Sequence, residues 1–145
     1  MALFLTSDEL KTHVYEEIVN EITRDDDDII TQAIQTAIDE AKGYLTRFDL
    51  EAIFDDPEPD ERNRMLLATI KDLAAWHLIK LANPNIDIEF RRMLYEDALR
   101  WLKGVQKGDI DVALPTPDNT DDEGVIGESD GAVKWKSNPK RNNHF

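Results

Sequence analysis

The side chains best suited to chemistry in this sequence are its three histidines, His13, His77 and His144. A metal site needs several ligands at matching spacing, and a nucleophilic site needs a Ser or Cys paired with a histidine base. None of the three histidines has such a companion, and His77 falls among apolar residues at helical spacing, which favours a hydrogen-bonded core histidine. A Gly-rich phosphate loop and a nucleophile elbow are also missing. We therefore expect no enzyme activity, no catalytic residues, no cofactor and no metal site.

A run of acids, Asp25 to Asp28, is a second candidate, because carboxylates bind calcium. An EF-hand loop also needs a glycine at its sharp turn and a bidentate glutamate at its twelfth position. Here glycine is missing, and the twelfth residue counted from Asp25 is Thr36. The run instead predicts that Asp27 or Asp28 caps the following helix, while the other acids lie at the positive end of the helix dipole.

The charge of the chain limits its partners. Its 145 residues include 17 basic and 31 acidic side chains, which gives a net charge of -14. Such a chain repels a phosphate backbone, so we expect no sequence-specific binding of nucleic acid. The sequence contains no cysteine and no apolar run of the roughly 20 residues that a membrane span requires, and its first residues do not resemble a signal peptide, so none is expected. We expect a soluble protein of the cytoplasm, or of a particle assembled there, that has no membrane partner.

The N-terminal residues predict one or two short helices. Thr6 is followed three residues later by Glu9, which is the spacing of a capping box, so a helix is expected to run to about His13. Apolar residues at helical spacing then predict a second short helix over residues 14–23, with the joint between the two near His13.

Three longer apolar patterns predict the main helices of an all-α bundle. The first covers Ile29 to Phe48, and residues 50–54 could add one further turn. An acidic loop with two prolines ends at Asp60, which is expected to cap the second helix. Asp87 is expected to cap the third, which runs to Gly108. The residues predicted to face the core are Ile30, Ala33, Ile34, Ala37, Ile38, Ala41, Tyr44, Leu45 and Phe48 in the first helix, Leu66, Leu67, Ile70, Leu73, Ala74, His77, Leu78 and Leu81 in the second, and Phe90, Leu94, Ala98, Trp101, Leu102 and Val105 in the third.

The composition changes after the third helix. We divide the chain into a helical bundle domain, residues 1–107, and an extended C-terminal arm, residues 108–145, which is first acidic and then basic. The arm has too few apolar residues to offset the entropy of ordering it alone. Residues 125–135 could form a small β-hairpin, which would need a surface to lie on. We expect the arm to be ordered by a partner or by a neighbouring copy.

Aromatic and basic residues are the candidates for a contact with another subunit. Trp76 lies off the main apolar line of its helix and Trp101 lies at the edge of its stripe, and tryptophan is enriched among interface anchors. Each could equally be a core residue with one wet edge. The basic end of the arm could dock on an acidic surface or stay disordered. The candidate interface residues are Trp76, Trp101, Lys134, Trp135, Lys136, Lys140, Arg141 and Phe145.

The chain also carries a series of short motifs in a distinctive order. They are Leu5-Thr6-Ser7-Asp8-Glu9-Leu10, the aspartate run before a long helix that includes Tyr44, Ile70-Lys71-Asp72-Leu73-Ala74-Ala75-Trp76-His77-Leu78, and then Arg91-Arg92, Tyr95-Glu96-Asp97-Ala98, Trp101-Leu102 and Lys107-Gly108. Amphipathicity explains the apolar positions of the last run but not its other residues. Over residues 3–110 this layout resembles a small helical family encoded in Mu-like prophages, which is grouped with the head-to-tail connector (adaptor) proteins of long-tailed bacteriophages. The acidic stretch 118–130 departs from the family's pattern, and Lys140-Arg141 with Phe145 is a loose match to its end.

The resemblance implies a structural virion protein. Such a head-completion protein forms a ring of identical subunits, typically a dodecamer, beneath the portal, and joins head to tail after DNA packaging. The implied partners are other copies of the chain, the portal protein and tail-side completion proteins, and the ring could surround a DNA channel. The implied location is the neck of the virion, assembled in the bacterial host cytoplasm.

Two other functions remain open at this point. The acidic loops could bind a basic partner, which would make the chain a cytoplasmic adaptor or regulatory protein. A small hydrolase would instead need a pocket of converging polar residues.

Overall fold

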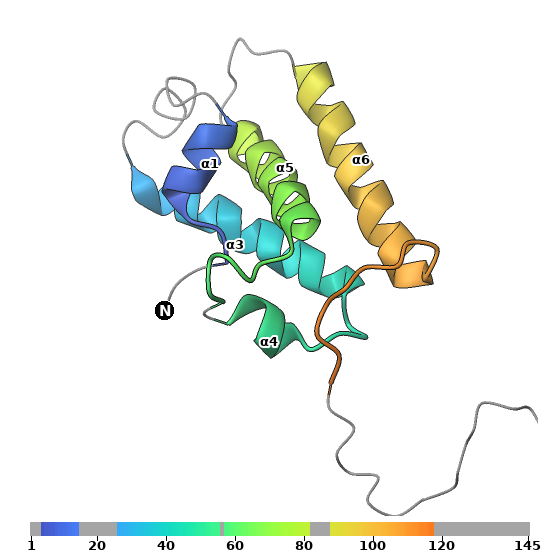
Figure 1. Cartoon of the computed structure of the whole chain (residues 1–145). Coiled ribbons are helices and arrows are strands. Elements are labelled where there is room, and N and C mark those ends of the chain that lie inside the picture. The colour runs from blue at the N-terminus through green and yellow to red at the C-terminus, as the bar shows by residue number, and fades with distance from the viewer. Residues whose placement is uncertain (1–3, 15–25, 56, 82–87, 118–145) are drawn as a thin grey trace, which may run out of the picture.

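The computed structural model describes residues 4–14, 26–55, 57–81 and 88–117 of the chain (Figure 1). These residues form five helices and no strand: α1 (Ser7–His13), α3 (Asp27–Tyr44), α4 (Leu50–Phe54), α5 (Arg64–Leu81) and α6 (Ile88–Lys107). The all-α bundle predicted from the sequence is confirmed. The predicted β-hairpin at 125–135 and nearly all of the predicted second N-terminal helix lie outside the described residues.

The long helix α5 is the centre of the bundle. It packs against both α3 and α6, while α1 lies against α3 and α5 (Figure 1). Its buried residues are spread around most of its circumference, as expected for a helix with neighbours on several sides: Leu66, Thr69, Ile70, Leu73, Ala74, Ala75, Leu78 and Ile79. On α3 the predicted face is buried at Ile30, Ala33, Ile34, Ala37, Ile38 and Ala41. Small alanines on that face let the backbones of α3 and α5 approach closely.

The start of each helix shows how local polar residues set its first turn. The predicted capping box of α1 is present, since the Thr6 hydroxyl accepts from the Glu9 backbone and the Glu9 side chain accepts from the Thr6 backbone. The prediction that Asp27 or Asp28 caps α3 is wrong by one residue: the cap is Asp26, whose side chain accepts from the Asp28 N–H at 3.0 Å. Both predicted caps are themselves helical and add negative charge to the first turn.

The start of α5 also differs from the prediction. Asp60 was expected as its cap, but α5 begins at Arg64 and Asn63 takes that place, because its Oδ1 accepts from the Leu66 N–H at 3.0 Å. The turn that contains Asp60 is held separately, by a hydrogen bond from the Glu61 N–H to a backbone oxygen three residues earlier. Residue 87, the cap predicted for α6, lies outside the described residues.

Helix α3 ends earlier than its apolar spacing predicts. The helix stops at Tyr44, whereas the pattern continued to Phe48. Leu45 and Phe48 are nevertheless buried, because two tight turns carry them onto the core: the Leu45 N–H donates to the Lys42 carbonyl and the Phe48 N–H donates to the Leu45 carbonyl. The short helix α4, expected as one further turn, then follows.

The predicted core face holds over only the second half of α6. Ala98, Leu102 and Val105 are buried, but Phe90 is 50% exposed. The same correction applies to the end of α5, where Leu81 is 63% exposed. Helical spacing identifies one face of a helix, but it does not show how far along that face a neighbouring helix extends.

The chain after α6 turns back onto the bundle. Gly108 has a φ of 83°, the left-handed conformation that glycine adopts without strain at a helix C-terminus. The extended segment 109–117 then runs back towards α4 (Figure 1), where the Asp49 N–H donates to the Pro115 carbonyl at 2.9 Å. Its partly buried residues Ile110, Val112 and Leu114 pack against the core. The start of the predicted arm is thus extended and attached to the body.

Candidate interaction surfaces

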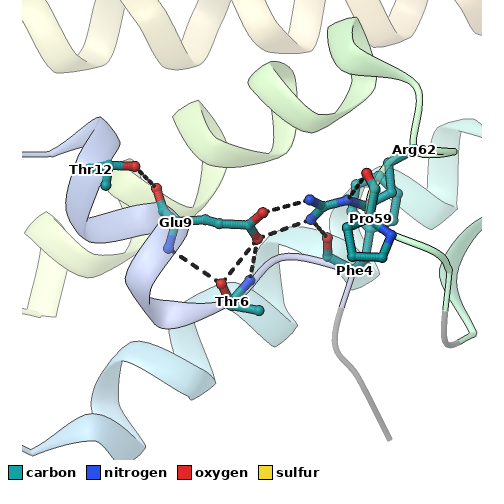
Figure 2. Close-up of polar contacts among 6 residues, drawn as sticks. All are labelled: Phe4, Thr6, Glu9, Thr12, Pro59 and Arg62. Carbon is teal, nitrogen blue, oxygen red and sulfur yellow. Dashed lines mark hydrogen bonds and ion pairs between the residues drawn. The ribbon is translucent and has the colours of Figure 1, made fainter.

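Arg62 ties the N-terminal segment to the start of α5 (Figure 2). Its guanidinium donates to both carboxylate oxygens of Glu9, at 3.0 and 2.5 Å, and also to the backbone carbonyls of Phe4 and Pro59. The hydrogen bond from Arg62 lowers the pKa of Glu9 from 4.5 to about 2, and hydrogen bonds from Thr6 act in the same direction, while burial opposes them. The charge of this nearly buried arginine is therefore balanced within the fold.

A second polar cluster joins α3, α5 and α6. The Glu40 carboxylate on α3 accepts from the Tyr95 hydroxyl at 2.7 Å and lies 2.6 Å from Nε2 of His77. The Tyr95 ring stacks on Trp76 with a centroid distance of 5.5 Å. Burial raises the pKa of Tyr95 above its ordinary value, and the Glu40 hydrogen bond and charge raise it further, so the phenol stays a neutral donor. The His77 side chain is therefore hydrogen-bonded and only 13% exposed, which agrees with the predicted hydrogen-bonded core histidine.

The surroundings of this cluster favour a structural role. A proton-transfer site needs a reacting group within hydrogen-bond reach. One hollow includes His77 and Thr36 in its lining, and the Thr36 hydroxyl donates to the Gln32 carbonyl at 2.8 Å. The cluster joins side chains of α3, α5 and α6 and so helps to position α6 against the other two helices.

The first half of α6 carries apolar side chains on its surface. Among the described residues, the large exposed apolar side chains are Met65, Leu81, Ile88, Phe90 and Met93, and three of them fall within the first six residues of α6. We call Phe90 and Met93 the α6 patch. Phe90 and Met93 are three residues apart and so share one side of the helix, where they line a shallow hollow together with charged neighbours. Exposed apolar side chains gathered in one place are typical of an interaction site.

A hollow under α4 is the other candidate surface. It has a volume of about 250 Å³ and lies between the N-terminal segment, α4, the loop that leads to α5, and the extended segment after α6. We call it the α4 groove. Its lining residues are Phe4, Ala52, Ile53, Pro57, Glu61, Arg62, Asn63, Ala113, Leu114 and Pro115.

The predicted interface residues are placed only in part. Trp76 is partly buried against Tyr95, and Trp101 is partly buried against the core. Both have intramolecular contacts, and their contact with another subunit stays a prediction. The other predicted residues, Lys134, Trp135, Lys136, Lys140, Arg141 and Phe145, lie outside the described residues.

Neither of the two polar clusters is predictable from the sequence. Arg62 and Glu9 are 53 residues apart, and Tyr95 and Glu40 are 55 apart, so no local spacing signals either pair. The His13 side chain likewise meets Asp72, 59 residues away, at 2.7 Å. Because the chain has so many acidic residues, its sequence does not show which carboxylate will pair with which donor in the fold.

The described part of the chain contains neither a metal-binding cluster nor a helix that could cross a membrane. Within residues 4–14, 26–55, 57–81 and 88–117, His, Asp and Glu side chains do not gather in a group that could hold a metal ion. Over those same ranges, every helix is too short or too polar to cross a membrane.

Comparison with known proteins gave one family. A family model described as "Bacteriophage Mu, Gp36" matches residues 4–128, which is most of the 145-residue chain. The match extends past residue 110, where the motif resemblance ends, and includes most of the acidic stretch. No curated protein and no solved structure matched the chain.

Proposed function

The chain belongs to the bacteriophage Mu Gp36 family, and on this premise we propose that it is a structural virion protein of the head-to-tail connector type. In this proposal, copies of the chain form a ring beneath the portal, typically a dodecamer, and complete the head before the tail joins. The protein acts by assembly alone, without catalytic residues or a cofactor. Its partners are its own copies, the portal protein and tail-side completion proteins, and its place is the neck of a virion assembled in the host cytoplasm.

The α6 patch is the observation that best supports this proposal. A ring made of identical subunits needs two different complementary faces on each copy, because each subunit contacts the next head to tail. Phe90 and Met93 are 50% and 51% exposed and lie on one side of α6, so they offer one such face. The second half of α6 is anchored by buried Leu102 and Val105, and the first half, which carries the patch, extends from this anchored part.

The charge of the chain supports a place around DNA. A net charge of -14 lets a polyanion pass along a channel without adhering to it, since like charges repel. A ring of such subunits would therefore conduct DNA and would not bind a particular sequence. No membrane partner enters this proposal.

Particles assembled in a host from a phage genome that carries variant α6 patches test the proposal. We expect Phe90→Asp together with Met93→Asp to leave DNA-filled heads and complete tails unjoined, with infectious yield reduced at least a hundredfold. Gln106→Asp is the matched control, because residue 106 is exposed on the anchored half of α6, and it should give normal particles. Electron microscopy counts the joined and unjoined species.

The location of the chain in particles can contradict the connector proposal. Antibody-labelled gold against the chain should mark the neck of intact particles. Label at the tail tip, or recovery of the chain only outside particles, would rule out the connector role. Normal particles from the Phe90→Asp, Met93→Asp variant would remove the α6 patch from the proposal.

An acidic adaptor that binds a basic host protein is the alternative. The acids around α4 favour this alternative. Residues 49–61 contain seven acids and no basic residue: Asp49, Glu51, Asp55, Asp56, Glu58, Asp60 and Glu61. Under this alternative, the chain would co-purify at low salt with one basic host protein and with no particle component. The connector proposal expects the reverse.

A further inference from the structure

We infer that the α4 groove of one copy binds the terminal segment of a second copy, residues 131–145, with Trp135 inserted in the groove. The inference deepens the proposed assembly function, because it names a contact by which neighbouring copies hold one another. Three features support it: the lining of the groove, the charge at its rim, and the point at which the chain leaves the body.

The groove is lined mainly by apolar side chains. Buried Phe4 and Ile53 and partly buried Leu114 are among the residues that line it, together with the exposed residues Ala52 and Pro115. Its volume is about 250 Å³. Apolar cavities of roughly 150 Å³ already take up a benzene molecule, so this hollow can receive an aromatic side chain.

The rim of the groove is acidic. Glu61 belongs to the lining itself, and Glu51, Asp55, Glu58 and Asp60 are exposed on α4 and on the loop that follows it, each within two positions of a lining residue. The nearest cation in the lining is the Arg62 guanidinium, but Glu9 already binds it. An arriving segment therefore meets apolar surface surrounded by negative charge, which favours a basic segment with an aromatic residue.

The terminal segment of the chain has this chemistry. Residues 131–145 contain Lys134, Lys136, Lys140 and Arg141 and no acid, and Trp135 lies between the first two lysines. Tryptophan and arginine are also the residue types most enriched among interface anchors. The positive charge and the tryptophan of residues 131–145 thus match the acidic surroundings and the apolar lining of the groove.

The path of the chain favours a groove on a second copy. Residues 113–115 form one wall of the groove, so the chain leaves the body at the rim. The spacer that follows, residues 118–130, contains six acids and no basic residue. A return to the groove of the same copy would fold these six acids into a loop beside the acidic rim, which brings like charges together, whereas a spacer that runs to another copy can stay extended. A spacer of this length spans at most about 45 Å, which is enough to reach an adjacent subunit.

Cross-linking between full-length copies tests the inference, and the natural absence of cysteine makes it clean. One preparation carries Ala52→Cys in the groove lining, and a second, with an affinity tag, carries Ser137→Cys two residues from Trp135. Mixed at high concentration with a short bismaleimide, they should give a cross-linked heterodimer. The matched control is Gln35→Cys, exposed on α3 and outside the groove lining, which should give at least tenfold less product.

Charge exchange then separates docking from chance encounters. Lys134→Glu with Lys136→Glu in the tagged copy should reduce the cross-link at least fivefold. Glu58→Lys with Glu61→Lys in the groove copy should restore at least half of it, because the two charges are then swapped. Trp135→Ser should also reduce the yield at least fivefold. Circular dichroism checks that each variant keeps the helical content of the parent.

Three results would overturn the inference. The first is equal cross-linking at Gln35→Cys, and the second is a cross-link that the charge exchange does not restore. The third is a concentration-independent link within a single chain that carries both cysteines, which would mean that the groove binds the terminus of its own chain. The location of the protein in particles is a separate measurement. A chain found at the neck that fails to cross-link refutes this contact alone, and one that cross-links but is absent from particles refutes the connector proposal.

Discussion

The Glu9 carboxylate is held by Arg62 at a pKa of about 2, against 4.5 when it is free, so the pair stabilises the fold only while the carboxylate is ionised. Because the folded pKa is the lower one, this stabilisation is fully present above pH 4.5 and is lost as the pH falls towards 2. Glu9→Gln keeps a capping-box side chain but removes the charge. We expect it to lower the free energy of unfolding by about 1–2 kcal/mol at neutral pH, after allowance for solvent screening of a partly exposed group.

Urea denaturation at several pH values measures this effect. The difference between the Glu9→Gln variant and the parent should shrink as the pH falls from 4.5 to about 2. Glu96→Gln, at an exposed site on α6, is the control and should stay within about 0.5 kcal/mol of the parent. An equal loss at neutral and low pH would mean that the ion pair is not the cause.

Tyr95 offers a second test at the level of one side chain. Tyr95→Phe removes the hydroxyl that donates to Glu40 but keeps the ring that stacks on Trp76. We expect a loss of about 1 kcal/mol, the usual net value of one hydrogen bond, and a larger loss for Tyr95→Ala, which also removes the ring. Thermal unfolding compares the two variants. An unchanged stability of Tyr95→Phe would show that the hydroxyl adds nothing, and equal losses in the two variants would show that the ring adds nothing.

Helix α6 should differ in stability along its length. Leu102 is fully buried in its second half, whereas Met93 in its first half is 51% exposed. Leu102→Ala should therefore cost about 2–5 kcal/mol, and Met93→Ala at most about 0.5 kcal/mol. Hydrogen exchange should protect the amides of residues 98–105 more than those of residues 88–93. Similar costs for the two substitutions would mean that the α6 patch is buried in the free protein.

At the scale of helices, the sequence predicts where helices form, but it does not predict where every helix begins or ends. The capping box of α1 was found because four adjacent residues contain all of it. The end of α3 was missed because Leu45 and Phe48 reach the core through turns, and apolar spacing does not distinguish such turns from one more helical turn. The sequence does not single out Asn63 as the cap of α5, because the aspartates just before it, such as Asp60, are equally good cap residues.

The boundary of the folded body can be measured on the whole molecule. Truncation after Pro117 removes only residues outside the described part and should leave the free energy of unfolding nearly unchanged. Truncation after Gly108 also removes Ile110, Val112 and Leu114, which pack against the core. That variant should lose about 2–4 kcal/mol, at roughly 1 kcal/mol for each partly buried side chain. Equal stability of the two truncated chains would place the boundary at the end of α6.

At this scale the sequence predicted the class of the fold and the kind of protein, but not its surfaces. The apolar spacing and the motifs around Tyr95 and Trp101 led to a helical bundle and to a phage family. The α6 patch and the α4 groove could not be foreseen, because each depends on where neighbouring segments stop or return. Phe90 fits a core stripe as well as Leu102 does, and only the packed bundle separates them.

The exit of the chain beside α4 has a consequence for the polarity of any ring. In a cyclic assembly every subunit has the same orientation relative to the rotation axis, so all the chains emerge at one level. The ring would then have one face fringed with terminal segments and one face without them. A connector with two different faces could bind the head through one face and the tail through the other, and so join them in a fixed orientation.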